Sequence, residues 1–364
     1  MAIVATNNAS TIASPVNYVL MRGLLSAAKK TLPFFNNTLQ GNLEKSGNGA
    51  ASVKWRRIEN LGVVTSALSE LSDGATVAFG IGRTSVKPTI TDVTKAIAKY
   101  GNAITTTEEV DLFNVNSNTM SLMDTLGANA GESLNYAMST EFKNATQTRY
   151  ASGAANKSAV VAEMKIGDIK YAVNLLNRNS AMKTESVAHG STNIGSSPVR
   201  SSYFGICHPD VEEDIRGLTG FIGVEQYGGY TQSFTGEFGA VGGVRWCSSE
   251  IAPIETAAGT TSTSAAGTFR ATSSTSADEN DVYWSFVYGK EAVGSVALGE
   301  NHAEEIYKMY DRVPTVELIQ HKPGSSGIGD MFNEVGSIAW KAWFGGKILN
   351  GNWIVQILTL AKSL

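Results

Sequence analysis

Residues 62–101 constrain the fold more than any other stretch of the sequence, because they cannot form a hydrophobic core. The stretch is rich in Thr, Ser and Gly, contains Lys87 and Pro88, and has too few large apolar residues to pack together. A segment of this composition gains too little from burial to offset its ordering entropy. The stretch VKWRRIENL, residues 53–61, precedes it and alternates as a strand does. We therefore expect a long hairpin-like excursion.

A long helix is predicted for residues 118–148, with Asn116 and Ser117 as candidate N-caps. Its apolar residues recur at intervals of three and four, which is the spacing of one helix face. These residues are Met123, Leu126, Ala130, Leu134, Ala137, Met138 and Phe142. One side of the helix is therefore expected to pack against the rest of the protein.

Further strands and helices are predicted along the remaining sequence. A second helix is expected over residues 159–182, and YFGICHPDVEEDIRGL is expected to be a strand followed, after Pro209, by a helix. GEFGAVGGVRWCSSEIAPI is expected to be one glycine-punctuated strand, and VYWSFVYGKEAVGSVAL and NWIVQILTL are expected to be strands rich in β-branched and aromatic residues. Residues 257–281 are low in complexity and predict an exposed loop.

Charge is sparse and unevenly distributed. Charged residues make up 17% of the chain, against about 25% in an average soluble domain. Residues 1–57 contain seven Lys and Arg residues and a single acid, Glu44, whereas the remainder contains 22 basic and 32 acidic residues. A basic arm on an acidic body can bind nucleic acid or the next copy of that body.

The cysteines and the hydropathy pattern indicate a cytosolic product. Cys207 and Cys247 lie in apolar strand-like runs without CxxC spacing, so buried thiols are expected. The polar opening MAIVATNNASTIAS lacks the cationic start of a secretory signal. Apolar runs stay well short of the ~20 residues that cross a bilayer.

The glycine-rich stretch from His321 to Leu349 fails the tests for a phosphate-binding loop. Gly345, Gly346 and Lys347 are followed by Ile348 rather than by Ser or Thr, and the spacing of the other glycines is GxxGxG rather than GxGxxG. We therefore interpret the glycines as turn residues. The four histidines are scattered, without the spacing of a zinc helix, and a GxSxG motif is lacking. Neither catalysis nor a cofactor or metal is supported, and the acidic body argues against a nucleic-acid-binding protein.

The order of the elements resembles the major capsid proteins of tailed phages, of the podovirus type with an HK97-like fold. The stretches that carry the resemblance are YFGICHPDVEEDIRGL, GEFGAVGGVRWCSSEIAPI, VYWSFVYGKEAVGSVAL and HKPGSSGIGDMFNEVGSIAWKAWFGGKILNGNWIVQIL. VKWRRIENL, the Thr-rich hairpin and the long helix agree more loosely. Together they cover most of the chain.

The resemblance implies an α+β fold in five parts. Residues 1–50 would be an N-terminal arm, and residues 51–101 an extended loop, the E-loop, that reaches over a neighbouring subunit. Residues 102–159 would belong to a peripheral domain with a long spine helix, residues 160–285 to an axial domain, and residues 286–364 to the second part of the peripheral domain. Residues after the 321–330 loop would form a helix and a strand, with Trp340, Trp343, Phe344 and Trp353 in the core or at subunit contacts.

The implied function is structural rather than enzymatic: pentamers and hexamers of one chain would build an icosahedral phage head around double-stranded DNA. Scaffold, portal and decoration proteins would be further partners, DNA would be contacted non-specifically, no membrane would be involved, and the protein would reside in the virion. An encapsulin-like nanocompartment shell and an enzyme with a site of scattered residues are the alternatives. The candidate subunit-interface residues are Lys29, Lys30, Lys54, Arg56, Arg57 and Lys87.

The basic residues near the hairpin root are expected to meet acidic groups of a neighbouring subunit rather than DNA. Arg56 and Arg57 are adjacent in a predicted strand, so their side chains are expected on opposite faces and with different partners.

Overall fold

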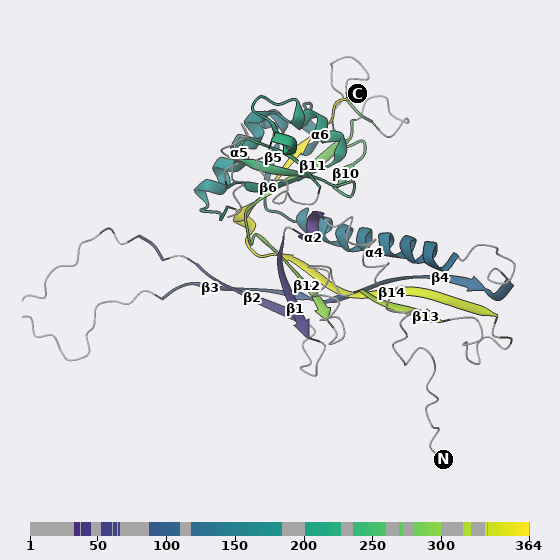
Figure 1. Ribbon diagram of the computed structural model, residues 1–364. Helices are drawn as coiled ribbons and strands as arrows, with labels where there is room; N and C mark the ends of the chain where they lie inside the picture. The colour runs from purple at the N-terminus through teal and green to yellow at the C-terminus, as the bar shows by residue number, and fades with distance from the viewer. Residues whose placement is uncertain are drawn as a thin grey trace, which may run out of the picture.

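The computed structural model describes most of the chain, in several segments. They are residues 33–36, 38–44, 52–59, 61–63, 65, 87–109, 118–183, 201–226, 236–259, 269–271, 280–299, 316–321, 332 and 334–363. These residues form a compact part with one large sheet, a long helix lying along a second sheet, and a two-stranded hairpin that projects away from both (Figure 1). No helix of the described segments is long and apolar enough to cross a membrane.

The larger sheet has eight strands and forms the compact part. Its order is β5 (Gln147–Tyr150), β15 (Ile354–Thr359), β11 (Val282–Tyr288), β6 (Tyr203–Cys207), β9 (Val244–Ser248), β8 (Glu237–Val241) and β7 (Ile222–Gly223), and β10 (Ile254–Glu255) pairs with β11. Helices α5 (Ile166–Arg178) and α6 (Pro209–Arg216) pack on one face of this sheet through a shared apolar cluster. Short 3-10 turns are η1 (Ala151–Gly153), η2 (Lys157–Ala159) and η3 (Val224–Gln226).

The second sheet has five strands and carries the long helix α4 (Asn118–Phe142). Its order is β1 (Leu39–Glu44), β12 (Val293–Gly299), β14 (Val335–Ile348) and β13 (Val316–His321), with β4 (Ala98–Thr107) also paired to β14. The predicted apolar face of α4 is confirmed: Met123, Leu126 and Phe142 are buried against the sheet. The helix ends at Phe142, six residues before the expected end at 148, because the chain turns at Asn144 and enters β5.

One continuous core joins the two sheets. Alternate residues of β11 point to opposite faces, so Phe286 and Tyr288 pack toward α4 while Tyr283 and Val287 pack toward α5 and α6. The ring of Phe142, on α4, lies 5.5 Å from that of Phe286 and meets it edge to face. The large sheet is therefore held to the long helix by aromatic packing rather than by strand pairing.

The short helix α2 (Pro33–Asn36) anchors the end of the expected N-terminal arm in this core. Phe34 and Phe35 are buried, and the ring of Phe34 lies 5.1 Å from that of Phe142. The backbone N–H of Phe34 donates to Oδ1 of the buried Asn135 on α4 at 3.1 Å. Residues 33–44 therefore belong to the folded body, since β1 also pairs with β12.

The stretch after the 321–330 loop forms the long strand β14, so the expectation of a helix there was wrong. The expectation that the Gly345–Gly346 pair forms a turn was wrong as well, because both residues lie within this strand. A Cβ atom at Gly346 would collide with Met138 Sδ on α4, and one at Gly345 would lie 3.3 Å from the carbonyl oxygen of Ala96. The glycines thus let the helix and the hairpin end approach β14 closely.

Two further expectations, each of a single continuous strand, differ from the structure. GEFGAVGGVRWCSSEIAPI forms two paired strands, β8 and β9, because Gly242 and Gly243 take positive φ values of 65° and 87° and turn the chain. VYWSFVYGKEAVGSVAL divides into β11 and β12, which lie in different sheets. Strand β15 lies in the eight-stranded sheet, so residues 286–364 do not stay in one sheet. Cys207 and Cys247 are buried thiols, as expected.

Candidate functional site at the root of the hairpin

The hairpin consists of β2 (Ser52–Ile58) and β3 (Ile90–Ala96), which pair in antiparallel register. The predicted alternation is confirmed, because exposed and half-buried residues alternate along both strands. Lys54 and Arg56 lie on the exposed face, and Trp55 and Arg57 lie on the half-buried face. An isolated two-stranded hairpin is marginally stable in water, so contacts at its root decide how it is held.

Asp92 organises the charges of the exposed face. It accepts a hydrogen bond from Nε of Arg56 at 3.0 Å and lies 2.6 Å from Nζ of Lys54. These hydrogen bonds, that of Arg56 first, lower the pKa of Asp92 to about 2. Lys54 and Arg56, both predicted interface residues, therefore share one acid within the hairpin. Two cations and one carboxylate leave a net positive charge on this face.

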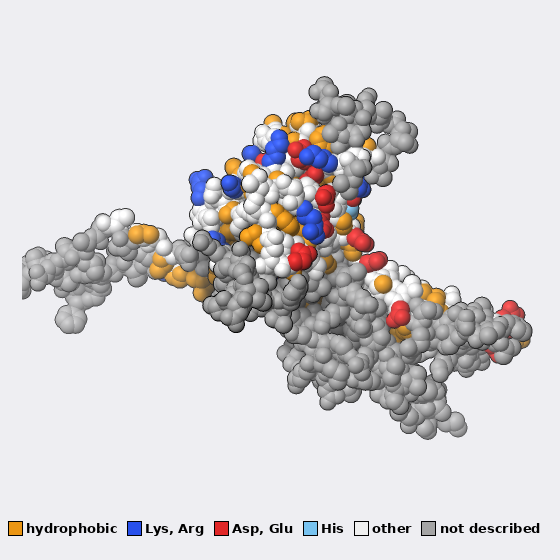
Figure 2. Space-filling model, turned by 45° about the horizontal axis from the view of Figure 1, so that its top comes forward, with side chains coloured by type: hydrophobic (Ala, Val, Ile, Leu, Met, Phe, Trp, Pro, Cys, Tyr) orange, Lys and Arg blue, Asp and Glu red, His pale blue; other side chains and the backbone are white. Residues whose placement is uncertain are grey.

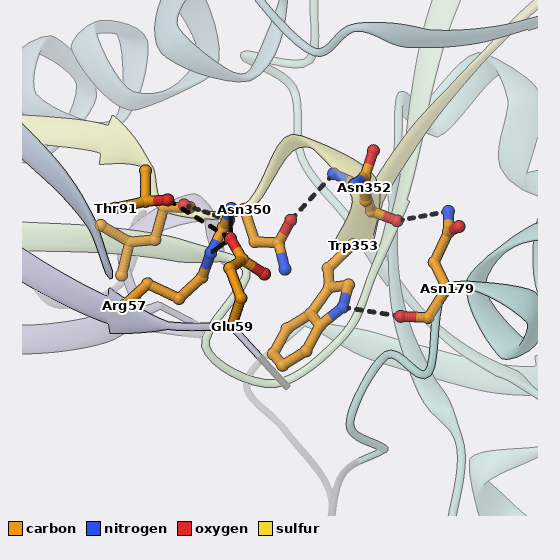
Figure 3. Close-up of polar contacts among 8 residues, drawn as sticks. Arg57, Glu59, Thr91, Asn179, Asn350, Asn352 and Trp353 are labelled. Atoms are coloured by element: carbon orange, nitrogen blue, oxygen red, sulfur yellow. Dashed lines mark hydrogen bonds and ion pairs between the residues drawn. The ribbon is translucent and has the colours of Figure 1, made fainter. Parts of the chain in front are cut away.

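Arg57 ties the opposite face of the hairpin to the body. Its Nε donates to Glu59 Oε1 at 2.8 Å, and one terminal nitrogen donates to the carbonyl oxygen of Leu349 at 3.0 Å (Figure 3). Thr91, on β3, also points its hydroxyl at Glu59. The guanidinium thus links β2 to the segment that follows β14.

That segment is the crossover between the two sheets. Residues 349–353, which include the turn η5 (Gly351–Trp353), lead from β14 in the five-stranded sheet to β15 in the eight-stranded sheet. Asn350 accepts the backbone N–H of Asn352, and the indole N–H of Trp353 donates to the carbonyl oxygen of Asn179 at 3.0 Å (Figure 3). The amide of Asn179 donates back to the carbonyl oxygen of Asn352 at 3.0 Å. Hairpin, crossover and the end of α5 therefore meet at one polar junction.

A second link joins the hairpin to the long helix. Glu141 of α4 is buried, with a side chain 9% exposed, and lies between Lys95 of β3 and Lys347 of β14. Its two oxygens are 3.2 Å from Nζ of Lys95 and 3.0 Å from Nζ of Lys347. A buried carboxylate with two cationic partners fixes the three elements against one another.

The outer part of the hairpin exposes apolar side chains. Ile58 and Ile90 face each other across the strands and are 63% and 51% exposed, and Leu61 and Val63 just beyond are 57% and 89% exposed. Figure 2 shows hydrophobic side chains along this projecting segment. Exposed apolar residues gathered on a projecting element mark a surface that binds a partner.

The structure brings three of the predicted interface residues together. Lys54, Arg56 and Arg57 lie within seven residues of one strand, whereas Lys87 is exposed just before β3, and Lys29 and Lys30 lie outside the described residues. Glu141 and the Leu349 carbonyl were missed. Their partners are 46 and 292 residues away in sequence, and no local pattern indicates such contacts. Within the described ranges, His, Cys, Asp and Glu do not gather in groups able to hold a metal ion.

Comparison with solved structures shows which proteins have a similar fold. No protein-family model and no curated relative matches the sequence. The structure is similar to the capsid of Ralstonia phage GP4, with a TM-score of 0.63 and 11% identity over 92% of each chain. It is also similar to the cyanophage Pam1 capsid, with a TM-score of 0.53 and 12% identity over 89% of each chain. The head structure of Helicobacter pylori bacteriophage KHP40 gives a TM-score of 0.53 and 12% identity over 91% of each chain. The predicted fold class is therefore confirmed: the chain has the HK97-like fold of phage capsid proteins.

Proposed function

We propose that this chain is the major capsid protein of a tailed phage, a structural protein without a catalytic role. Copies would assemble into pentamers and hexamers and close into an icosahedral head around double-stranded DNA. The observation that carries the proposal is the projecting hairpin with its exposed pair Ile58 and Ile90. In a monomer this apolar surface stays in water at a cost of about 25 cal/mol per Å².

The parts of the fold suit a shell subunit. In our proposal the hairpin is the extended loop, the five-stranded sheet with α4 is the peripheral domain, and the eight-stranded sheet with α5 and α6 is the axial domain. The axial domain then includes β15, so the last part of the chain returns to it rather than remaining peripheral. Loops that lie over neighbours add to interfaces of the size that obligate assemblies need, commonly above about 2,000 Å².

Single ion pairs at such contacts contribute little, about 0–1 kcal/mol when exposed to solvent. Lys54 and Arg56 already have Asp92 as an intrachain partner. We propose that they act on an acidic neighbour through the net positive charge that remains. In this proposal, apolar burial supplies most of the contact energy. The charges determine how the hairpin is aligned on the neighbouring subunit.

The test is the double substitution Ile58→Glu and Ile90→Glu, with Ile58→Val and Ile90→Val as the matched control. Because two carboxylates cannot be buried unpaired, the Glu variant should give no shells by negative-stain electron microscopy and sediment as free subunits or capsomers. The Val variant should assemble. Thermal melting of both should match the wild type, because both positions lie outside the core. Normal shells from the Glu variant would show that this part of the hairpin takes no part in the contact between subunits.

A further inference from the structure

Helix α5 presents a basic and amide-rich face to solvent. Its apolar side, with Ile169, Ala172 and Leu176, is buried against the eight-stranded sheet. The opposite side exposes Lys170 and Arg178. The acid of this helix, Asp168, does not offset them, because it is buried and paired with Arg149 at 3.0 Å.

Among the residues that the structure describes, the cations of this face form no ion pair. Neither Lys170 nor Arg178 forms an ion pair with any residue that the structure describes. The same holds for Lys165, which precedes the helix. Beside Arg178 the surface is hollowed by about 430 Å³, with Tyr171, Asn174 and Asn177 in its lining. The amide and guanidinium groups that line this hollow can donate hydrogen bonds to carboxylates.

An acidic surface of the same compact part lies around α6. Glu213 on this helix and Glu250 at the end of β9 are exposed, and neither is ion-paired within the described segments. Glu250 follows Ser249, whose backbone N–H donates to the carbonyl oxygen of Cys207, so Glu250 lies near the start of α6, the helix that carries Glu213. In Figure 2, Lys and Arg lie at the left margin of the compact part, on the side of α5 in Figure 1. Asp and Glu lie toward the top and the right, where further Lys and Arg lie among them.

We propose that the α5 face, defined by Lys170, Arg178 and the hollow beside Arg178, docks on the α6 face, defined by Glu213 and Glu250, of the next copy of this chain. This inference rests on the proposed function and identifies the surfaces that meet inside a capsomer. Complementary faces on two sides of one subunit make a head-to-tail contact, which generates a closed ring when the rotation fits. The contact is polar, so it selects the neighbour and its orientation more than it adds affinity.

A second copy fits this face better than nucleic acid does. Binding along a phosphate backbone needs many cations, because each phosphate contact adds one step of counterion release. The α5 face has two cations separated by asparagine and tyrosine, and the chain as a whole carries a formal net charge of −4. The neighbour's carboxylates supply the opposite charge in matching number.

The test is charge reversal on each face and on both. Lys170→Glu with Arg178→Glu, and Glu213→Lys with Glu250→Lys, should each raise the protein concentration for half-maximal capsomer formation by at least about tenfold. The chain that carries all four substitutions should recover wild-type assembly, because every contact in the ring is again between opposite charges. Lys170→Arg with Arg178→Lys keeps the charge and should assemble normally. Far-UV circular dichroism and melting should be unchanged throughout, since the four residues are exposed.

Three outcomes would overturn the inference. Normal capsomers from the α5 reversal would exclude this face from the contact, and failure of the four-substitution chain to recover would exclude Glu213 and Glu250 as its partners. Normal assembly combined with weakened binding of double-stranded DNA would assign the face to nucleic acid. Failure of the proposed function is distinguishable, because in that case the wild-type chain itself forms neither rings nor shells.

Discussion

At the scale of single residues, side-chain direction could be predicted and partners could not. Alternation along VKWRRIENL correctly predicted that Arg56 and Arg57 face opposite ways, since strand geometry is local. Besides Glu59, Arg57 has as its partner a backbone carbonyl 292 residues away, which carries no sequence signal. The contact between Gly346 and Met138, which needs a residue without a Cβ atom, could not be predicted from the sequence either. Contacts of this kind depend on which strands pair.

His208 makes a pH-dependent contribution to stability at the start of α6. Its Nδ1 accepts the backbone N–H of Asp210 at 3.1 Å, and this acceptor is lost on protonation. Burial lowers the pKa of His208 from 6.5, against the opposing pull of Asp210 and Glu250, while Arg270 adds to the lowering. Because the unfolded chain takes up the proton more readily, this stability is complete above about pH 6.5 and is lost as the pH falls through the folded-state pKa.

We expect His208→Asn to remove this dependence. Asparagine is a good N-cap and does not titrate, so the loss of unfolding free energy between pH 7.5 and pH 5 should be smaller than in the wild type. Urea unfolding of both proteins at the two pH values measures the difference. Equal losses would show that the stability change at acid pH comes from other groups.

At the scale of elements, periodicity located the helices and strands and misjudged where they end. The apolar spacing of α4 was correct because burial imposes it, but the turn at residues 143–146 leaves no apolar signal. Likewise α5 begins at Ile166, seven residues after the expected start at 159. Glu141 could not be assigned a role from its place on α4, since its partners come from β3 and β14.

Glu141→Gln should loosen the hairpin without unfolding the body. The substitution removes the acid shared by Lys95 and Lys347, which are only partly exposed, at 35% and 38%. We expect a loss of about 1–3 kcal/mol in the free energy of unfolding. Amide exchange in β2 and β3 should accelerate by about tenfold, because 1.4 kcal/mol corresponds to one factor of ten.

Asp92→Asn is the matched control for this prediction. Asp92 pairs with Lys54 and Arg56 inside the hairpin and makes no ion pair with the body among the described residues. It should leave exchange at the end of β3 near Lys95 unchanged. If both variants accelerate exchange there equally, Glu141 does not hold the hairpin to α4.

At the scale of the whole molecule, sequence patterns predicted many of the strands but not which of the two sheets each strand joins. Strand β11 lies in the eight-stranded sheet and β12 in the five-stranded sheet, and the chain crosses back from β14 to β15. The first crossing, from β11 to β12, occurs within a stretch that was expected to be one strand. The second, from β14 to β15, occurs within residues that were expected to belong to one domain. Sheet membership is decided by pairing with β6 and β5, far away in sequence, and by the aromatic core around Phe142.

The low-complexity residues 257–281 are not an exposed loop throughout, contrary to expectation. Phe269 pairs as an isolated bridge with Lys362 and packs against an apolar cluster. Arg270 lies 2.7 Å from Asp210, and its backbone N–H donates to the carbonyl oxygen of Ala361 at 3.0 Å. The loop is therefore attached to the body in its middle, so its tolerance of insertions should depend on position.

A ten-residue Gly/Ser insert between Ser274 and Thr275 should leave assembly and melting unchanged, because the surrounding residues are small and polar. The same insert between Phe269 and Arg270 should separate the apolar anchor from the ion pair and lower the free energy of unfolding by about 1–3 kcal/mol. Shell yield and melting temperature of the two insertion variants measure this contrast. Equal tolerance at both sites would mean that the attachment at residues 269–271 contributes nothing to stability. Loss of shells with an unchanged melting temperature at the Ser274 site would instead place that part of the loop in a subunit contact.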